Sequence, residues 1–137
     1  MVNFKVAYSE IYSCFVNTNT FKNLTTKQLH NMNYKFSHIG IPTTEEKNWD
    51  GYCEPGNFKY TDFSKNKYNI EWVKFDKGST AHPMVKTLPH VSYFVDSIED
   101  AIEGHELLGN IFSPAEGIRV AYINHQNAPV EFLEIKE

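Results

Sequence analysis

The sequence predicts an α+β fold in which paired β-α-β-β-β modules form a curled mixed sheet around a central cleft, with a reduced helix in the first module. Three observations lead to this prediction. The segments "NIEWVKF" (69–75) and "PVEFLEI" (129–135) repeat one order of residue types, and each carries a glutamate inside an apolar strand. A histidine opens an earlier strand in each half, His38 in one and His90 in the other. A capped helix follows the second of these opening strands.

The opening strand and the helix of the second half are the most regular elements. "HVSYFVDS" (90–97) is rich in β-branched and aromatic residues, which favour a strand. Ser97 and Asp100 then have the spacing of a capping box, which starts a helix by satisfying free amide groups of its first turn. We expect this helix to stop at Gly109. Its buried stripe consists of Ile98, Ala101, Ile102 and His105.

Three more strands complete the second module. A short extended piece is expected around 111–112, and "GIRVAYIN" (117–124) alternates as a strand does. "HQNAP" is a polar turn, and "VEFLEI" is the return strand. The order is therefore β-α-β-β-β from about residue 88 to the C-terminus.

The first half contains a reduced copy of this unit. "KFSHIGIPT" (35–43) is the opening strand, and the stretches 56–63 and 68–75 are two later strands. Between Pro42 and Gly56 there is no helical periodicity of useful length, so a loop replaces most of the helix. The weakly helical segment 25–34 is a candidate to cover the place that the missing helix would occupy.

These elements divide the chain into an N-terminal extension and one domain. The extension is residues 1–33, either an added cover or the edge of a fused neighbour domain. The domain is residues 34–137, with module one at 34–78, a linker at 79–87 and module two at 88–137.

Composition and charge exclude several classes of function. The 137 residues suffice for a core, and the net charge of −4 argues against a nucleic-acid partner. Arg119 is the only arginine, so bidentate clamps for phosphate are scarce. Cys14 and Cys53 are isolated and have no metal-ligand spacing, so we expect reduced thiols and a cytoplasmic protein. Neither a membrane-spanning run nor a signal peptide is visible, so no membrane partner is expected.

The duplicated residues predict a metal site. His38 and His90 open the two modules, and Glu71 and Glu131 close them. If the modules pack as a pair, two imidazoles and two carboxylates converge, and this mixed set suits a divalent first-row metal. The metal charge would also compensate carboxylates that are otherwise costly to bury.

The opening strands "HIGIPT" and "HVSYFV", with the closing strands "IEWVKF" and "VEFLEI", resemble the vicinal oxygen chelate superfamily over residues 34–137. This group includes glyoxalase I, bleomycin-resistance proteins and extradiol dioxygenases. The resemblance implies Zn, Ni, Co, Mn or Fe bound by His38, Glu71, His90 and Glu131. It further implies that a carboxylate acts as general base, for which we take Glu71 as the mobile candidate and Glu131 as the permanent ligand.

Three functions follow from this resemblance. The first is a metal-dependent glyoxalase-like lyase or isomerase that acts on a small substrate with vicinal oxygens through an enediolate. The second is an Fe(II) extradiol dioxygenase, in which Glu71 would be surplus. The third is a metal-free module that binds or senses a small molecule, either as bleomycin-resistance proteins do or as the ligand domain of a regulator. The resemblance also suggests a homodimer, and no glutathione or CoA signature specifies the substrate.

The ligand candidates also have purely structural interpretations. Either histidine could be a strand residue satisfied by a backbone partner. Glu131 and Glu134 could alternate on a solvated edge strand, and Glu71 could pair with nearby lysines.

Other residues admit two roles as well. Tyr93, Tyr122 and Trp49 could line a pocket or pack in the core, while Trp72 and Phe132 are expected to pack as core on the opposite face from the glutamates. His82 could lie above the mouth of the pocket or could be an ordinary loop residue. Arg119 could bind a substrate carboxylate or could lie on the outer face of its strand.

Overall fold

A computed structural model of the chain describes residues 33–136. Residues 34–136 belong to a compact unit that runs from Tyr34 to Glu137. The N-terminal extension up to residue 32, including nearly all of the predicted segment 25–34, lies outside the described residues. No helix among the described residues is long and apolar enough to cross a membrane.

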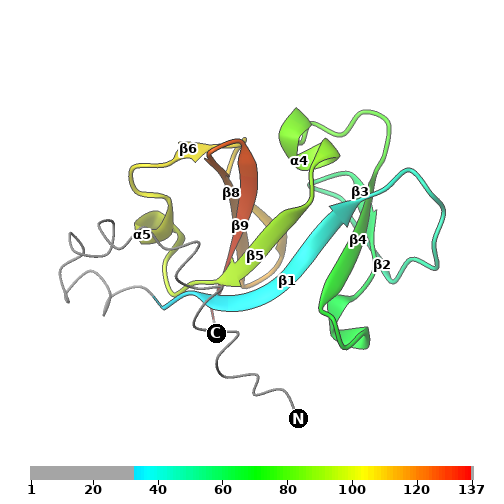
Figure 1. The fold of residues 1–137 in the computed structure, drawn as a ribbon, viewed down its shortest axis with the longest axis horizontal. Coiled ribbons are helices and arrows are strands. Elements are labelled where there is room, and N and C mark those ends of the chain that lie inside the picture. The colour runs from blue at the N-terminus through cyan, green and yellow to red at the C-terminus, as the bar shows by residue number, and fades with distance from the viewer. Residues whose placement is uncertain (1–32, 137) are drawn as a thin grey trace, which may run out of the picture. The chain divides into compact units, whose positions relative to one another are not determined.

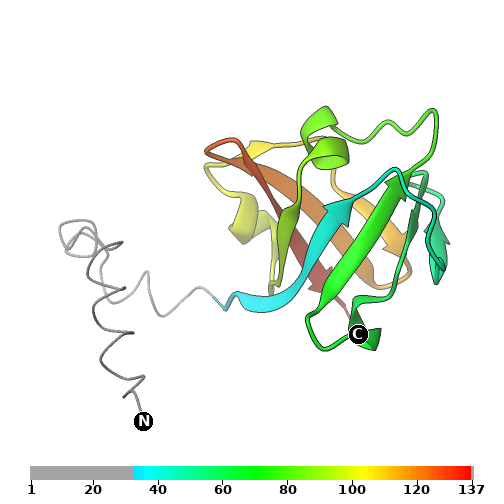
Figure 2. The ribbon, with the colours of Figure 1, turned by 45° about the vertical axis from the view of Figure 1, so that its right-hand side comes forward.

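The described unit is built on one mixed sheet of nine strands that curls around a concave face (Figures 1 and 2). The strand order is β2-β3-β4-β1-β5-β9-β8-β6, and β7 pairs with β8. The strands are β1 Lys35–Pro42, β2 Gly51–Cys53, β3 Phe58–Tyr60, β4 Ile70–Phe75, β5 His90–Phe94, β6 Glu106–Leu107, β7 Phe112–Ala115, β8 Ile118–His125 and β9 Ala128–Ile135. Three short helical segments connect them: η1 Phe63–Lys65, α4 Pro83–Thr87 and α5 Ile98–Ile102. The predicted curled mixed sheet is confirmed.

The two modules meet through their opening strands, which pair antiparallel at the centre of the sheet (Figure 1). In each module the opening strand also pairs parallel with the closing strand, β1 with β4 and β5 with β9. The register is the same in both. Gly40, two residues after His38, lies opposite Glu71, and Ser92, two residues after His90, lies opposite Glu131. The duplication seen in the sequence is therefore also a duplication of strand pairing.

The faces of the central strands differ in what they contact. Side chains alternate along a strand, so Glu131 and Leu133 of β9 face the concave side, while Phe132 and Glu134 face α5. The space beneath α5 holds the apolar core of the second module, formed by Val95, Ile98, Ala101, Ala121, Ile123 and Phe132. The expected packing of Phe132 as a core residue is confirmed.

Helix α5 is shorter than the sequence pattern predicted. It ends at Ile102, and Gly104 follows with a φ of 74°, a left-handed conformation that suits glycine. His105 is exposed, and the next residues form β6, which pairs with β8. The prediction of a helix up to Gly109 was wrong, because the chain turned back to pair with the sheet.

The first module has no helix between its opening strand and η1. Residues 43–50 are without helix or strand, and a short strand, β2, follows at Gly51–Cys53, where none was predicted. The predicted reduction of the helix in this module is confirmed. Within the described residues, no helix therefore follows the opening strand of this module as α5 follows β5 in the second.

Candidate metal centre

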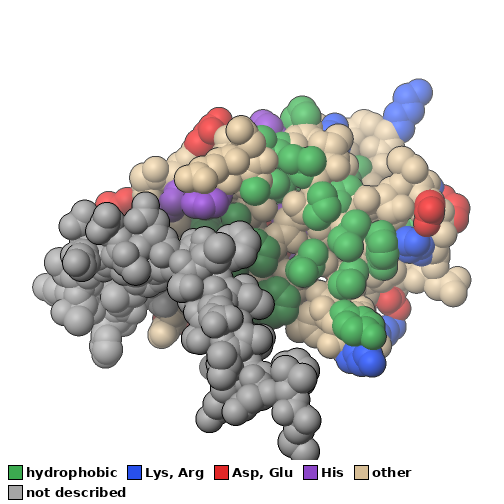
Figure 3. Space-filling view, viewed as in Figure 1, with side chains coloured by type: hydrophobic (Ala, Val, Ile, Leu, Met, Phe, Trp, Pro, Cys, Tyr) green, Lys and Arg blue, Asp and Glu red, His purple; other side chains and the backbone are tan. Residues whose placement is uncertain are grey.

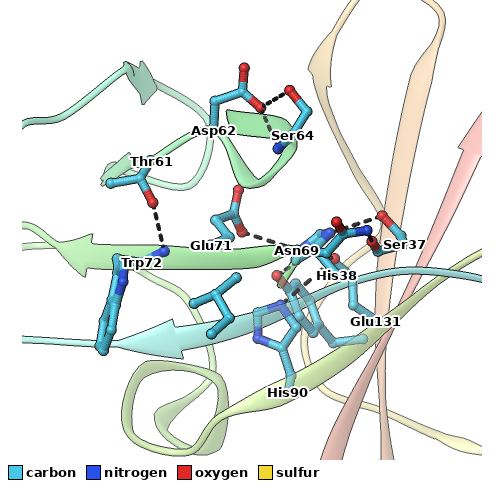
Figure 4. Close-up of polar contacts among 12 residues, drawn as sticks. Ser37, His38, Thr61, Asp62, Ser64, Asn69, Glu71, Trp72, His90 and Glu131 are labelled. Atoms are coloured by element: carbon cyan, nitrogen blue, oxygen red, sulfur yellow. Dashed lines mark hydrogen bonds and ion pairs between the residues drawn. The ribbon is translucent and has the colours of Figure 1, made fainter. Parts of the chain in front are cut away.

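Four strands each bring one ionisable side chain to the concave face: His38 on β1, Glu71 on β4, His90 on β5 and Glu131 on β9 (Figure 4). His38 Nε2 lies 3.2 Å from Glu71 Oε2 and 3.3 Å from Glu131 Oε2. His90 Nε2 lies 3.7 Å from the same Glu131 oxygen. One ligand atom from each of His38, Glu71 and His90 falls within 4.8 Å of the others, so these three form a group that could hold a metal ion.

Buried polar atoms at this point have no hydrogen-bond partner among the described residues. They are His38 Nε2, His90 Nδ1, His90 Nε2, Ser92 Oγ and Glu131 Oε2. Buried polar groups in proteins are nearly always paired, so such a cluster needs an explanation. Metal–ligand bonds of about 2.0–2.2 Å put neighbouring ligand atoms roughly 3.0–3.5 Å apart, close to the separations found here. The donor set and its spacing therefore fit a divalent metal.

Two further contacts turn the donor atoms toward the centre. Ser37 Oγ lies 2.9 Å from His38 Nδ1, and a neutral His38 with its proton on Nδ1 donates it to Ser37 and leaves the Nε2 lone pair free. The Tyr122 hydroxyl donates to Glu131 Oε1 at 2.6 Å, which leaves Oε2 facing the two histidines. Such second contacts orient ligands in metal sites.

Gly40 makes room for one of the ligands. A Cβ atom built on Gly40 would overlap the imidazole ring of His90, which lies on the neighbouring strand directly opposite. Glycine at this position therefore lets the His90 ring lie flat against the backbone of β1, in line with the other donors.

The charges of the site compensate one another when no metal is bound. Burial pushes the pKa of Glu131 upward, but His90 and His38 outweigh burial and lower this pKa to about 2. Burial pushes the pKa of His38 downward, but Glu71 and Glu131 outweigh it and raise this pKa. Burial and the Glu131 carboxylate raise the pKa of Tyr122 well above its usual range, so its hydroxyl stays a donor. A proton on His38 thus supplies the positive charge that a bound metal would otherwise provide.

A cleft of about 340 Å³ opens beside the four side chains. His38, Glu71 and Glu131 form part of its wall, and Tyr122, one of the aromatic residues with two predicted roles, lines it too. The remaining wall comes from β2, β3 and β4 of the first module and from β7, β8 and β9 of the second. The predicted central cleft between the modules is therefore present.

The second acid of β9 has a structural role on the opposite face. Glu134 is 2 % exposed, accepts a hydrogen bond from the Ile98 amide at 2.8 Å and forms an ion pair with Arg119. Arg119 also pairs with Glu99, which agrees with its interpretation as an outer-face residue. Since β9 lies between β5 and β8, the interpretation of Glu131 and Glu134 as solvated edge-strand residues was wrong.

The remaining candidates lie away from the four side chains. Trp72 is half-buried on the opposite side of β4 from Glu71, with the Lys47 ammonium over its ring, so its predicted core packing was wrong (Figure 4). Trp49 donates to Glu46 on the surface, and Tyr93 packs against the core. His82 accepts from the Met84 amide and so caps α4, and Lys74 pairs with Glu46 instead of Glu71.

Sequence reasoning missed the residues that orient the ligands. Ser37 and Gly40 flank His38 in "SHIG", but nothing in that string shows that β5 lies opposite it. The equal spacing of Gly40 and Ser92 after the two histidines was the available signal, and it needed the antiparallel pairing of β1 with β5 to have meaning.

Comparison with known proteins supports the fold. Neither a protein-family model nor a curated protein sequence matches the chain. Among solved structures, the chain is similar to a hypothetical protein from Bacillus halodurans C-125, with a TM-score of 0.51 and 20 % sequence identity. The match covers 77 % of this chain and 96 % of the Bacillus protein, and at this identity it shows a shared fold.

Proposed function

We propose that the chain binds one divalent metal through His38, Glu71, His90 and Glu131 and acts as a glyoxalase-like lyase or isomerase of the vicinal oxygen chelate superfamily. The observation that carries this proposal is the convergence on one point of buried nitrogen and oxygen atoms that have no hydrogen-bond partner among residues 33–136. The equal His and Glu register of the two modules supports the superfamily assignment. The substrate is a small molecule with two adjacent oxygens.

The bound metal would supply Lewis-acid stabilisation of the negative charge that develops on those oxygens, as in an enediolate. The chain supplies the base. Glu71 is the more exposed acid, with 16 % of its side chain accessible against 7 % for Glu131, and it lines the cleft. It therefore takes the proton from the hydroxyl-bearing carbon of the substrate and returns it to the adjacent carbonyl carbon in an isomerisation.

The other residues hold this arrangement. His38 and His90 act as neutral imidazoles, and the Tyr122 hydroxyl keeps Glu131 in one orientation. Closed packing around Glu131 makes it a fixed ligand, while Glu71 has room to move between a ligand position and a substrate proton.

Elemental analysis after reconstitution with Zn, Ni, Mn or Fe tests the metal. We expect about one metal per chain, lost in His90→Ala and kept in Glu134→Gln, a control that changes a buried acid on the opposite face of the sheet. Deuterium exchange at the hydroxyl-bearing carbon of an α-hydroxyketone, whose deprotonation gives an enediolate, tests the base. Glu71→Gln should retain metal and lose exchange.

The absence of metal under every reconstitution condition would contradict this proposal. A second candidate then applies, a metal-free module that binds a small molecule. The apolar lining of the cleft favours it, and ligand-dependent stabilisation in the presence of chelator would support it.

A further inference from the structure

The cleft beside the metal centre has one polar wall, and its other walls are apolar. Its charged side chains are His38, Glu71 and Glu131, all of them metal-ligand candidates. No lysine or arginine is found among the described residues that line it. The rest of the lining is dominated by rings and aliphatic groups, including Phe58, Phe63, Phe75, Phe94, Leu133 and Ile135.

Two pairs of rings are in contact along the wall of the cleft. Phe63 of η1 stacks on the imidazole of His38, with ring centroids 4.4 Å apart and planes 15° from parallel. Phe58 and Phe75 contact each other across β3 and β4 with centroids 5.4 Å apart. These contacts fix the rings beside the metal ligands, so that a ligand held at the metal would lie against hydrocarbon surface.

Three cations of the described chain are held by acids away from the cleft. Arg119 is held by Glu99 and Glu134 on the far face of β8, and Lys65 and Lys74 pair with Asp50 and Glu46. An anionic group placed in the cleft away from the metal would lose its hydration without gaining a cationic partner. That loss is strongly unfavourable, whereas an apolar group gains from leaving water.

The size of the cleft limits the ligand as well. Its volume of about 340 Å³ is near the lower end of the range of roughly 300–1,000 Å³ typical of small-molecule sites. Such a volume suits a single ring or a short branched chain. It does not suit a nucleotide or a tripeptide conjugate.

We propose that the cleft selects a substrate whose body is small, apolar and uncharged, and whose adjacent oxygens provide its only polar end. This inference rests on the proposed function for the orientation of the substrate, because the polar end is placed at the metal. The selection itself comes from the walls of the cleft and acts on any ligand that enters it.

A matched pair of chelating probes tests the selection. 4-Nitrocatechol and 4,5-dihydroxybenzene-1,3-disulfonate present the same two adjacent oxygens, and the second adds two sulfonates to the ring. On zinc-loaded protein, the absorbance change should show at least about tenfold tighter binding of 4-nitrocatechol, because the sulfonates have no cation in the cleft. Equal binding, or tighter binding of the disulfonate, would overturn the inference.

A probe without adjacent hydroxyls separates this inference from the metal proposal. 4-Nitroanisole has the same kind of ring and should raise the melting temperature of chelator-treated protein. If the protein holds no metal but still binds 4-nitroanisole, the proposed function fails and the apolar cleft stands. If the protein holds metal and neither neutral probe binds, the cleft inference fails alone.

Two exposed positions give matched variants. Ile135 lies at the cleft and is 59 % exposed, while Leu107 is an exposed aliphatic residue on β6 that does not line the cleft. Ile135→Lys should shift the preference toward the disulfonate by about tenfold, and Leu107→Lys should leave it unchanged. A similar shift in both variants would show that overall charge, not the cleft, sets the selection, and would overturn the inference.

Discussion

The two modules carry the same candidate ligands in the same register, but among residues 33–136 only the second has a helix packed on its outer face. Beneath α5, Phe132 and its neighbours form a closed core. In the first module, Ile39 on the outer face of β1 remains 38 % exposed, and Trp72 is covered by the Lys47 side chain. Figure 3 shows hydrophobic side chains gathered over β1 and β4 on the face turned to the viewer.

The two modules also differ in the surroundings of their glutamates. Glu131 is buried and accepts a hydrogen bond from the Tyr122 hydroxyl. The only ion-pair partner of Glu71 within residues 33–136 is His38. A strand packed on both faces fixes its side chains, and a strand packed on one face leaves them more freedom. The comparison teaches that two copies of one duplicated unit can place equivalent glutamates in different packing, the more buried one suited to a fixed ligand and the more exposed one to an adjustable ligand.

Removing each glutamate in turn is the strongest test of this comparison. Glu131→Ala should lower metal affinity by at least about 100-fold, because it removes the more buried of the two candidate acids, the acceptor of the Tyr122 hydroxyl and the ion-pair partner of His90. Glu71→Ala should lower it by about tenfold. Competition titration against a chelator measures both, with circular dichroism to check folding. Equal losses would show that the difference between the modules does not reach the metal.

The two residues that follow the histidines by two positions provide a second test. Gly40→Ala should lower metal affinity by about 10- to 100-fold, because the added methyl group displaces the His90 ring. Ser92→Ala removes a buried hydroxyl that is not one of the four candidate ligands and displaces none of them, so it should change affinity by less than about threefold. The same titration measures both. A tolerant Gly40→Ala would mean that β1 moves to accommodate the methyl group.

The pH dependence of metal binding reports the proton on His38. Its pKa in the folded protein is raised above 6.5, so metal must displace this proton, and affinity should rise by about tenfold per pH unit below that pKa. Glu131, with a pKa of about 2, remains ionised throughout this range. Calorimetric titration from pH 5 to pH 8 checks the slope. A flat profile would show that His38 is already neutral.

The metal-free protein should respond to pH in the opposite sense. A raised His38 pKa gives stability that is complete below pH 6.5 and is lost as the pH rises through the folded pKa. A lowered Glu131 pKa gives stability that is present above pH 4.5 and is lost as the pH falls toward about 2. Thermal unfolding in chelator should therefore show greatest stability between about pH 4.5 and 6.5.

The smallest effect on the metal is expected from the acid on the outer face of β9. Glu134→Ala removes the acceptor of the Ile98 amide and the buried partner of Arg119, so the free energy of unfolding should fall by about 1–3 kcal/mol. Metal affinity should not change. Urea denaturation together with metal titration distinguishes the two faces of one strand. A loss of metal in this variant would show that the faces are coupled.

Much of the fold and of the candidate site could be predicted from the sequence. Alternation and β-branched residues located β1, β5, β8 and β9, and the missing periodicity after Pro42 correctly predicted a reduced helix. Repetition of His and Glu in equivalent strands gave the four residues that the structure brings together. These signals are local, or are repeats of a local pattern, so one chain displays them without any knowledge of contacts.

Other features were decided by contacts between distant segments. Helix α5 ended early because residues 106–107 paired with β8, and Glu134 was buried because α5 and Arg119 lay over it. Gly40 gained its role only when β5 placed His90 opposite it. The sequence by itself determined which residues were available as ligands and on which strands. The tertiary structure decided which donor atoms converged, since register and burial depend on strands that are far apart in the chain.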